Sequence, residues 1–193
     1  MNLVDDIVVK RLGRVEYLPT WQAMRTFTRA RTESTPDELW LLEHFPVYTV
    51  GQGAPEPKLR NVVRTDRGGD ITYHGPGQVV LYTLIDLARR AIKVKRFVWL
   101  LEQSVIDLLD GRAERKPGAP GVYVEGAKIA ALGIRVVRGR AYHGLSLNVD
   151  MDLAPFSAID PCGYPGLRVT QMNASIQETG ERLAELVIRN LDA

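Results

Sequence analysis

The amino-acid sequence predicts an α+β domain in which a mixed, largely antiparallel sheet is flanked by helices. Two observations favour this fold class. Apolar residues recur at helical spacing over 94–110 and again over 177–191, so each segment is predicted to be an amphipathic helix. The strand-like segments 121–125 and 128–137 are joined by a turn at Gly126, which is the pattern of an antiparallel hairpin.

Strand-like and helix-like segments alternate at the start of the chain. Residues 7–18 and 38–44 are rich in aliphatic side chains and are predicted strands, the second of which ends before Pro46. Between them, apolar residues at helical spacing predict a helix over 21–31, with Thr20 as its N-terminal cap. We expect this helix to bury one face.

The next part of the chain is extended and interrupted by loops. Residues 47–53 are a predicted strand that leads into a glycine-rich turn, and 54–58, with two prolines, are a predicted loop. The extended segment 62–65 leads into a polar loop, 67–78, and then into 79–85. This last run is largely apolar, which is typical of a strand buried in the core.

The second half contains the clearest helix. Its periodicity places it over 94–110, with Gly111 at the position of a C-terminal cap. Residues 112–121 are rich in charge, proline and glycine and are expected to form a mobile connection. A strand over 141–149 follows the hairpin, and a loop over 151–166 precedes the last helix.

The polar loop is the most unusual stretch, because it combines glycines and a proline with many hydrogen-bonding side chains. Its sequence is Arg67-Gly68-Gly69-Asp70-Ile71-Thr72-Tyr73-His74-Gly75-Pro76-Gly77-Gln78. The glycines permit positive φ and a close approach of backbone to ligand, while Pro76 limits how far the loop relaxes. We therefore expect the loop to hold a ligand. A phosphate-binding loop is disfavoured, since no Lys-Ser or Lys-Thr follows and the loop leads into a strand instead of a helix.

Composition argues against several classes of function. The 25 basic residues are nearly balanced by 23 acidic ones, without the excess typical of nucleic-acid-binding proteins. The sequence has no run of eighteen apolar residues and no signal peptide, so we expect a cytoplasmic protein without a membrane partner. One cysteine and three scattered histidines give no metal-binding pattern, and neither a metal nor a cofactor is expected. With 45% hydrophobic residues and no repeat or linker, residues 1–193 are predicted to form one domain.

A lone cysteine is most often a small buried hydrophobe, but the surroundings of Cys162 favour another interpretation. It lies in the turn-forming sequence Asp160-Pro161-Cys162-Gly163-Tyr164-Pro165-Gly166, which has no apolar periodicity. We therefore expect a reachable thiol, which could act as a nucleophile once ionised. Ionisation calls for a nearby cation or base, and the candidates are Lys128, His44, His74 and His143.

Lys128 is unusual because it lies in an otherwise apolar predicted strand. It alternates with Ala130, Leu132 and Ile134 and is expected to share their face. Its ammonium then either reaches water at the strand end or is partly desolvated, in which case a depressed pKa would suit it to exchange a proton with Cys162. Both interpretations fit the sequence. For each histidine, a structural role near a strand end fits at least as well as a catalytic one.

Ordered motifs surround these residues. In chain order they are Glu43-His44 with Pro46-Val47-Tyr48-Thr49-Val50-Gly51, Arg67-Gly68-Gly69 with Thr72-Tyr73-His74-Gly75-Pro76-Gly77-Gln78, Gly126-Ala127-Lys128-Ile129-Ala130-Ala131-Leu132-Gly133, His143-Gly144-Leu145-Ser146-Leu147-Asn148-Val149, and Cys162-Gly163 with Val169-Thr170. With these motifs the chain resembles the lipoyl(octanoyl) transferases of the biotin- and lipoate-protein ligase superfamily over nearly its whole length. Two flanking residues depart from that family's usual pattern, since Phe45 and Thr83 stand where it commonly has prolines.

The resemblance implies a fold and a set of roles. The fold is the superfamily's α+β domain with a central mixed sheet, forming a single acyltransferase domain. Cys162 would carry the acyl group as a thioester, and Lys128 would activate its thiol and act as general base. The residues implied to line the acyl pocket are Arg67, Gly68, Gly69, Asp70, Ile71, Thr72, Tyr73, His74, Ala131, Leu132, Gly133, Gly144, Leu145 and Ser146.

The resemblance also implies partners. The donor is octanoyl acyl carrier protein, and the acceptor is a specific lysine of the lipoyl domains of 2-oxoacid dehydrogenases or of glycine-cleavage H protein, in the first step of endogenous protein lipoylation. Exchange of one thioester for another costs little free energy, so no ATP is expected. Leu132, Ile134 and Leu145 are expected as apolar walls. The basic residues that either meet the acidic carrier or simply form a solvated helix start are Arg89, Arg90, Lys93, Lys95 and Arg96.

Two alternatives stay open on the sequence. An ATP-dependent lipoate- or biotin-protein ligase would share the glycine-rich loop and the lysine but would need no nucleophilic cysteine. A non-catalytic module that binds an acyl chain or a carrier protein would use the same pocket without any transfer.

Overall fold

The structure, a computed structural model, describes residues 7–55, 59–159 and 166–193. The strands are β1 (Ile7–Val15), β2 (Asp37–His44), β3 (Val47–Val50), β4 (Val62–Arg64), β5 (Ile71–His74), β6 (Gln78–Asp86), β7 (Glu114–Lys116), β8 (Ala119–Val124), β9 (Ala127–Val137) and β10 (Arg140–Asn148). The helices are α1 (Tyr17–Ala30), α2 (Val94–Leu108), α3 (Ile176–Leu191) and the short 3-10 helix η1 (Ala154–Ala158).

Two sheets organise these elements. The larger has seven strands in the order β1-β2-β6-β10-β9-β8-β7, and the smaller has three in the order β4-β3-β5. In the larger sheet β1 and β2 pair in parallel, and every other neighbouring pair is antiparallel. The predicted class, a mixed and largely antiparallel sheet flanked by helices, is confirmed.

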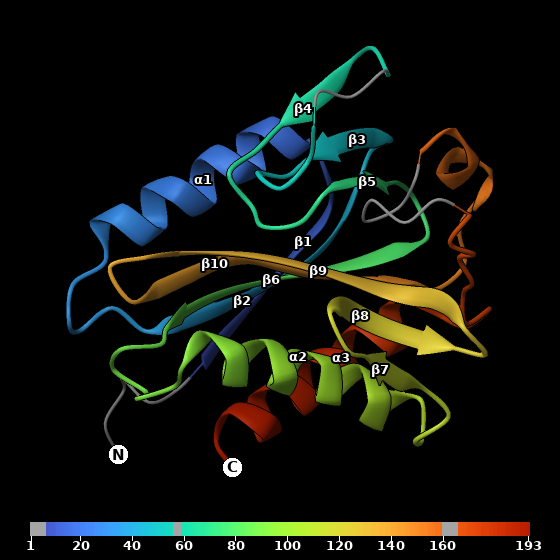
Figure 1. Cartoon of the computed structure of the whole chain (residues 1–193). Helices are drawn as coiled ribbons and strands as arrows, with labels where there is room; N and C mark the ends of the chain where they lie inside the picture. Colours follow the sequence, from blue (N-terminus) through green and yellow to red (C-terminus); the bar gives the residue numbers. More distant parts are fainter. Residues whose placement is uncertain (1–6, 56–58, 160–165) are drawn as a thin grey trace.

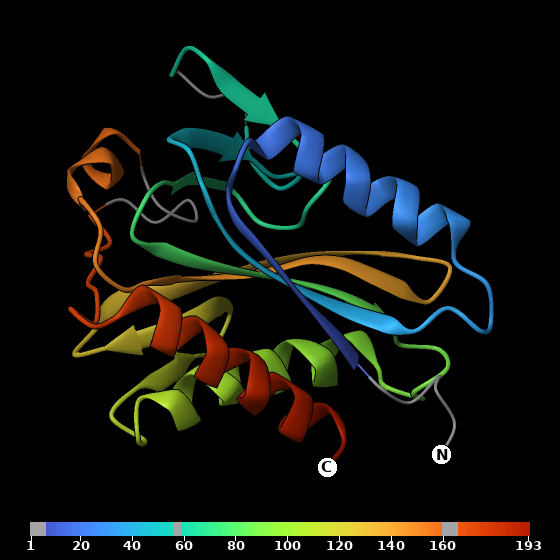
Figure 2. The same ribbon diagram turned by 180° about the vertical axis from the view of Figure 1, so that it is seen from behind.

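The larger sheet is covered on both faces (Figure 1). Helices α2 and α3 lie against one face, and α1 with the smaller sheet lies on the other, as the reverse view also shows (Figure 2). Strand β6 is buried on both faces, with Leu81 and Ile85 in the cluster that includes α2 and α3, and Tyr82 and Leu84 in the cluster that includes Met24 of α1. Double burial explains why the sequence of β6 reads as an apolar run. Among the described residues, no helix is long and apolar enough to cross a membrane.

Helix α1 differs from its prediction at its first turn. It starts at Tyr17 instead of Trp21, and Glu16 occupies the N-cap position without a capping side-chain bond. The Thr20 hydroxyl donates to the Glu16 carbonyl at 2.7 Å, so Thr20 lies inside the helix and its predicted role as cap is wrong. Three residues of the predicted first strand, 16–18, therefore belong to the helix cap or to the helix.

Two segments predicted as loops contain strands. Residues 112–121, expected to be a mobile connection, include β7 and the start of β8, which form a tight hairpin with Gly118 at φ 76°. Arg115 anchors this hairpin to α2 through a bond of 3.1 Å to Glu102. The polar loop likewise contains β5, which pairs with β3 in the smaller sheet. Short strands of this kind depend on a partner strand and leave little periodicity in the sequence.

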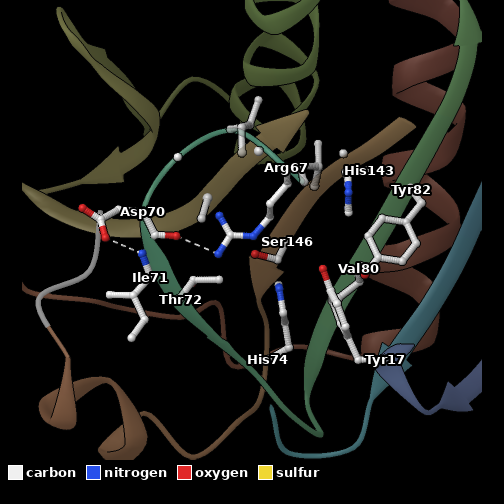
Figure 3. A pocket seen from close by; sticks show the side chains of 16 residues that line it. Tyr17, Arg67, Asp70, Ile71, Thr72, His74, Val80, Tyr82, His143 and Ser146 are labelled. Atoms are coloured by element: carbon white, nitrogen blue, oxygen red, sulfur yellow. Dashed lines mark hydrogen bonds between the residues drawn. The ribbon is translucent and has the colours of Figure 1, made fainter. Parts of the chain in front are cut away.

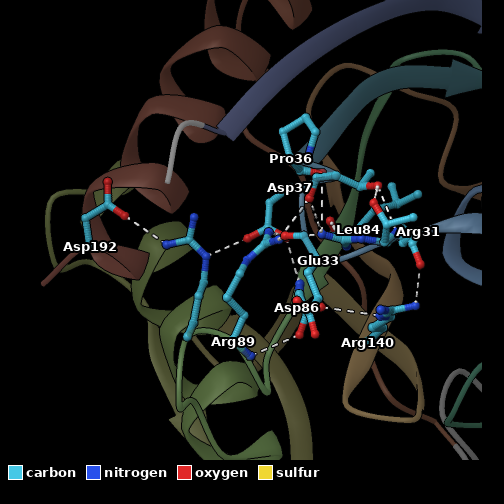
Figure 4. Close-up of polar contacts among 12 residues, drawn as sticks. Arg31, Glu33, Pro36, Asp37, Leu84, Asp86, Arg89, Arg140 and Asp192 are labelled. Carbon is cyan, nitrogen blue, oxygen red and sulfur yellow. Dashed lines mark hydrogen bonds and ion pairs between the residues drawn. The ribbon is translucent and has the colours of Figure 1, made fainter. Parts of the chain in front are cut away.

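A buried carboxylate ties the ends of several elements together. Asp37, at the start of β2, accepts hydrogen bonds from Arg31 at the end of α1, from Arg89 at 2.8 Å and from Arg90 at 2.6 Å (Figure 4). The backbone amide of Asp86 adds a fourth bond. Burial raises the pKa of Asp37, but these bonds outweigh it and hold the pKa below its ordinary value.

This network changes the interpretation of the basic segment near α2. Arg89 and Arg90 were expected in a basic cluster that meets an acidic carrier or forms a solvated helix start. Instead their guanidinium groups bind Asp37, whose side chain is fully buried. A carrier contact by Lys93, Lys95 and Arg96 stays a prediction.

Candidate active site

A pocket lies between the polar loop and the strands β9, β10 and β6 (Figure 3). Twelve of the fourteen residues expected at an acyl pocket line it, namely Arg67, Gly69, Asp70, Ile71, Thr72, His74, Ala131, Leu132, Gly133, Gly144, Leu145 and Ser146. The structure thus brings together three segments that are far apart in the sequence. Whether they bind an acyl chain stays a prediction.

Gly68 and Tyr73 do not belong to this lining. The Tyr73 ring packs away from the pocket, in a separate cluster with Phe156, and its centroid lies 5.1 Å from that of Tyr48. The Gly68 amide donates to the Ile134 carbonyl at 3.0 Å and so joins the loop to β9. Ile134, expected as an apolar wall, packs against the core on the α2 and α3 side.

Four residues that the site prediction omitted also line the pocket: Tyr17, Val80, Tyr82 and His143. Val80 and Tyr82 alternate on β6, whose pocket-facing side could not be identified without knowing the sheet order. His143 had a signal, because it begins the Gly-Leu-Ser motif and was a candidate base. Tyr17 had none, since it was placed in the preceding strand.

Arg67 stabilises the loop from within. It is only 7% exposed. Its guanidinium donates to the Thr49 carbonyl at 2.8 Å, to the Gly68 carbonyl at 2.9 Å and to the Asp70 carbonyl at 2.7 Å. The loop is therefore fixed to β3 by charge-assisted hydrogen bonds and can present a preformed wall to the pocket.

Glycine is required where the loop meets β9. A Cβ atom on Gly133 would lie 2.8 Å from the Gly68 carbonyl oxygen and 3.3 Å from the Arg67 Cδ. The loop backbone thus packs directly on the strand, and a side chain at this position would push it away.

His143 enters the pocket face because of its backbone conformation. Its φ is 62°, and the ladder between β10 and β6 is interrupted there, where the Thr83 hydroxyl donates to the His143 carbonyl at 3.1 Å. The His143 Nε2 donates to Asp66 at 2.9 Å. Asp66 also accepts from Tyr142 at 2.5 Å and from Trp21 at 2.8 Å.

Charge in this cluster resides on the carboxylate. Burial raises the pKa of Asp66, but the hydrogen bonds from His143, Tyr142 and Trp21 outweigh it and hold the pKa below its ordinary range. Burial lowers the pKa of His143, although its bond to Asp66 opposes this shift. The imidazole is therefore neutral at pH 7, with its proton on Nε2 and an acceptor at Nδ1. That Nδ1 is buried and has no hydrogen-bond partner among the described residues.

The other two histidines are also buried and neutral. The His44 Nδ1 donates to the Val15 carbonyl at 2.9 Å, so its Nε2 accepts the bond of 2.7 Å from the Tyr82 hydroxyl. Burial lowers the pKa of His44 to about 4 and that of His74 to about 3. Neither histidine can supply a cation to a thiolate at pH 7.

A chain of hydrogen bonds connects the loop to Lys128. The His74 Nδ1 lies 2.7 Å from the Gln78 Oε1, and the Gln78 Nε2 donates to the Asn148 Oδ1 at 3.0 Å. The Asn148 Nδ2 donates to the Thr170 carbonyl, and the Thr170 amide donates to the Lys128 carbonyl at 2.9 Å. The positions of the loop and of Lys128 are therefore linked.

The Lys128 side chain is buried, with 2% of the residue exposed. Its Nζ donates to the Pro120 carbonyl at 3.1 Å and lies 5.3 Å from the centre of the Tyr123 ring. The interpretation in which its ammonium reaches water is thus wrong. A register shift between β8 and β9 places both Ile129 and Ala130 in the core cluster, so the alternation is broken and Lys128 does not continue the aliphatic face.

Cys162 lies outside the described residues, so its predicted role as nucleophile stays a prediction. The chain that follows it is held against Lys128. Val169 forms a parallel bridge with Lys128, and the Lys128 amide donates to the Arg168 carbonyl at 2.8 Å. No group of three or more metal-ligating side chains is found within residues 7–55, 59–159 and 166–193.

Comparison with known proteins identifies the family. The lipoyl protein ligase A/B catalytic domain matches residues 16–191. The chain belongs to this family. Curated relatives include an octanoyltransferase of Aromatoleum aromaticum, 66% identical over 86% of this chain and 75% of the relative, and one of Dechloromonas aromatica, 59% identical over 96% and 97%. A third, from Azoarcus sp., is an octanoyltransferase that is 57% identical over 96% of this chain and 88% of the relative.

Solved structures of more distant proteins share the fold. A bipartite lipoate protein ligase of Thermoplasma acidophilum superposes with a TM-score of 0.70 at 18% identity, covering 96% of this chain and 84% of that one. Lipoate-protein ligase A bound with ATP superposes with a TM-score of 0.68 at 14% identity, covering 96% of this chain and 85% of that one. Biotin protein ligase of Aquifex aeolicus superposes with a TM-score of 0.63 at 12% identity, covering 96% of this chain and 70% of that one. At these identities the likeness concerns the fold alone.

Proposed function

We propose that the protein is an octanoyltransferase that acts in protein lipoylation. It takes an octanoyl group from octanoyl acyl carrier protein and passes it to a specific lysine of a lipoyl domain, in the cytoplasm. The acceptors are lipoyl domains of 2-oxoacid dehydrogenases and glycine-cleavage H protein. The observation that carries this proposal is the identity of 57–66% to relatives named octanoyltransferase, over at least 86% of the chain.

The chemistry proceeds in two acyl transfers. In the first, the Cys162 thiolate attacks the carbonyl carbon of the donor thioester, and the carrier's thiolate leaves and takes up a proton. In the second, the amine of the acceptor lysine attacks the enzyme thioester, Cys162 leaves as a thiolate, and a stable amide remains. One thioester replaces another in the first transfer, so no ATP is consumed.

Lys128 activates Cys162 and moves protons in both transfers. Of the four candidate groups, the three histidines are held neutral at pH 7 by burial, and His143 is already committed to Asp66. The backbone of Lys128 forms a bridge with Val169, seven residues beyond Cys162 in the sequence. As a neutral amine, Lys128 takes the proton of the Cys162 thiol, and its ammonium form then stabilises the thiolate and gives that proton to the leaving thiolate of the carrier. The regenerated amine accepts the proton of the attacking acceptor lysine in the second transfer.

The pocket suits an acyl chain on one side. Ala131, Leu132, Gly133 and Leu145 supply apolar or small surface, and the ordered loop closes it with Ile71. Each methylene of an acyl chain buried in this pocket would contribute about 0.8 kcal/mol of binding free energy.

The two alternatives predict different requirements for ATP and for transfer. An ATP-dependent ligase would modify a lipoyl domain from free octanoate and ATP, and a binding module would modify none. The test supplies octanoyl carrier protein or free octanoate to the purified protein, each with and without ATP, and follows the mass of an unmodified lipoyl domain. We expect octanoylation from the carrier in both conditions and none from free octanoate. Octanoylation that requires ATP would contradict the transferase.

A further inference from the structure

Two aromatic side chains close one side of the pocket. His143 and Tyr82 lie on the side away from Asp70 and Ile71 (Figure 3). Their ring centroids are 6.0 Å apart, with the rings nearly perpendicular. We call this pair the end wall.

Strand register gives the distance from Lys128 to the end wall. Ile134 pairs with His143 across β9 and β10, and Lys128 lies six residues before Ile134. At about 3.3 Å per residue this separation is about 20 Å along the strand. A lysine side chain spans about 6 Å, which leaves roughly 14 Å for the thioester group and the acyl chain.

This length corresponds to a medium acyl chain. A fully extended chain advances about 1.25 Å per carbon, so eight carbons span about 10 Å and twelve span about 15 Å. An octanoyl thioester whose reacting carbon is near Lys128 therefore fits in front of the end wall. A dodecanoyl chain would have to displace it.

Both side chains of the end wall are held from behind. The imidazole of His143 is bonded to Asp66, which is itself held by Tyr142 and Trp21. The Tyr82 hydroxyl donates to His44 at 2.7 Å. Because each ring has a fixed partner, neither can rotate out of the way without breaking a buried hydrogen bond.

One polar atom of the end wall, the acceptor His143 Nδ1, is buried without a partner among the described residues. Each further buried methylene favours binding about fourfold. The Nδ1 atom is already shielded from water, so a longer chain gains these methylenes only by displacing a ring of the end wall.

We propose that His143 and Tyr82 determine acyl chain length by stopping the chain at about eight carbons, with Asp66 and His44 as positioning residues. This inference rests on the proposed function, because it places the reacting carbon near Lys128. It assigns specificity to the end of the pocket that is farthest from Lys128 along the strands.

The test compares donors of different length. The kcat/KM for transfer to a lipoyl domain is measured with octanoyl, decanoyl and dodecanoyl carrier protein. His143→Gly removes the ring and suits the φ of 62°, which glycine adopts without strain. We expect it to raise the ratio of dodecanoyl to octanoyl transfer by about tenfold or more, as the freed space accepts further methylenes.

Controls separate the end wall from a general loss of structure. His143→Asn introduces a smaller residue that tolerates positive φ, and we expect it to raise the ratio of dodecanoyl to octanoyl transfer by less. This variant replaces His143→Gly in the comparison if the glycine variant does not fold. Tyr48→Phe removes a hydroxyl that bonds Pro155 outside the pocket and should leave the ratio unchanged. An equal loss of kcat/KM for all donors in both His143 variants would overturn the inference. A parent protein with the same kcat/KM for dodecanoyl and octanoyl donors would also overturn it.

A binding measurement tests the effect of the end wall on chain length without acyl transfer. Calorimetric titration with free octanoate and dodecanoate should show a preference for octanoate that His143→Gly reduces. If the parent transfers no octanoyl group but shows this preference, the proposed function is wrong, while the role of the end wall in selecting chain length is supported. Equal binding of both acids by the parent would overturn the end wall.

Discussion

At the scale of single residues, two buried polar side chains define what the pocket can do. The Nζ of Lys128 contacts the Pro120 carbonyl and the Tyr123 ring. His143 is a neutral imidazole oriented by Asp66. In the proposed mechanism, their separation along β9 and β10 puts proton transfer near Lys128 and chain recognition near His143.

Substitution of Lys128 tests its role toward the thiol. Lys128→Met keeps the length and buried volume of the side chain but removes its charge. If the ammonium stabilises the thiolate, alkylation of Cys162 by iodoacetamide should require a higher pH, with the midpoint of the rate profile raised by about one unit or more. The measurement is the alkylation rate between pH 6 and 10.

A matched control is Lys95→Met, because Lys95 is an exposed residue of α2. It should leave the profile of the parent unchanged. Identical profiles for Lys128→Met and the parent would show that Lys128 does not influence the thiol.

At the scale of elements, the contact between the polar loop and β9 shapes the pocket. The loop lies so close to the strand that Gly133 has no room for a side chain, and Arg67 holds the loop's carbonyls in place. A small displacement of this wall would change the position of a bound chain relative to Lys128.

Gly133→Ala should therefore impair both the pocket and stability. Its Cβ would lie 2.8 Å from the Gly68 carbonyl oxygen. We expect octanoyl transfer to fall by about tenfold or more and the free energy of unfolding to fall by about 1–3 kcal/mol, as is usual for overpacking. Transfer kinetics and urea unfolding measure the two effects.

The control for this substitution is Gly111→Asn. Gly111 has φ 75° and open space around its Cβ position, and asparagine tolerates this backbone conformation. Little change in transfer is expected. If Gly133→Ala behaved like Gly111→Asn, direct packing of the loop on β9 would not matter for activity.

The elements that could be predicted from the sequence are those in which burial sets the spacing of apolar residues. Helices α2 and α3 and strands β6 and β9 each contribute to one extended core cluster, so their apolar pattern was visible. Strands β5 and β7 have four and three residues and take their structure from pairing with β3 and β8. No local signal in the sequence could reveal them.

The candidate site was predictable to a different extent. The segments Arg67–His74, 131–133 and 144–146 carry motifs, and the structure brings most of them to one pocket. Tyr82 and His143 could not be placed, because their orientation depends on sheet order and on a positive φ at His143. The burial of Lys128 was an open question that only tertiary packing could answer.

At the scale of the whole molecule, one face of the large sheet is used for stability and the other for the site. The face toward α2 and α3 is aliphatic. On the opposite side lie all three histidines, His44 and His143 on the large sheet and His74 on β5 of the smaller sheet, each buried and neutral. These histidines make stability depend on pH.

Stability should decrease as pH falls from about 6.5 toward 4. The pKa values of His44 and His74 are lowered to about 4 and about 3, from ordinary values of 6.5. In this window the unfolded chain binds protons that the folded protein excludes, so the free energy of unfolding falls by about 1.4 kcal/mol per pH unit for each proton. Urea unfolding at pH 7, 6 and 5 measures the slope.

His74→Gln removes one of these protons and should reduce the slope by about that amount. A slope near zero in the parent, or one unchanged in His74→Gln, would contradict the assignment of buried neutral histidines.

The proposed mechanism depends most on a covalent acyl group at Cys162. The most direct measurement is the intact mass of the protein after incubation with octanoyl carrier protein, without ATP and without acceptor. We predict a single octanoyl adduct that maps to Cys162, is absent in Cys162→Ala and disappears when a lipoyl domain is added. An unmodified mass in the parent, or octanoyl transfer that persists in Cys162→Ala, would contradict it.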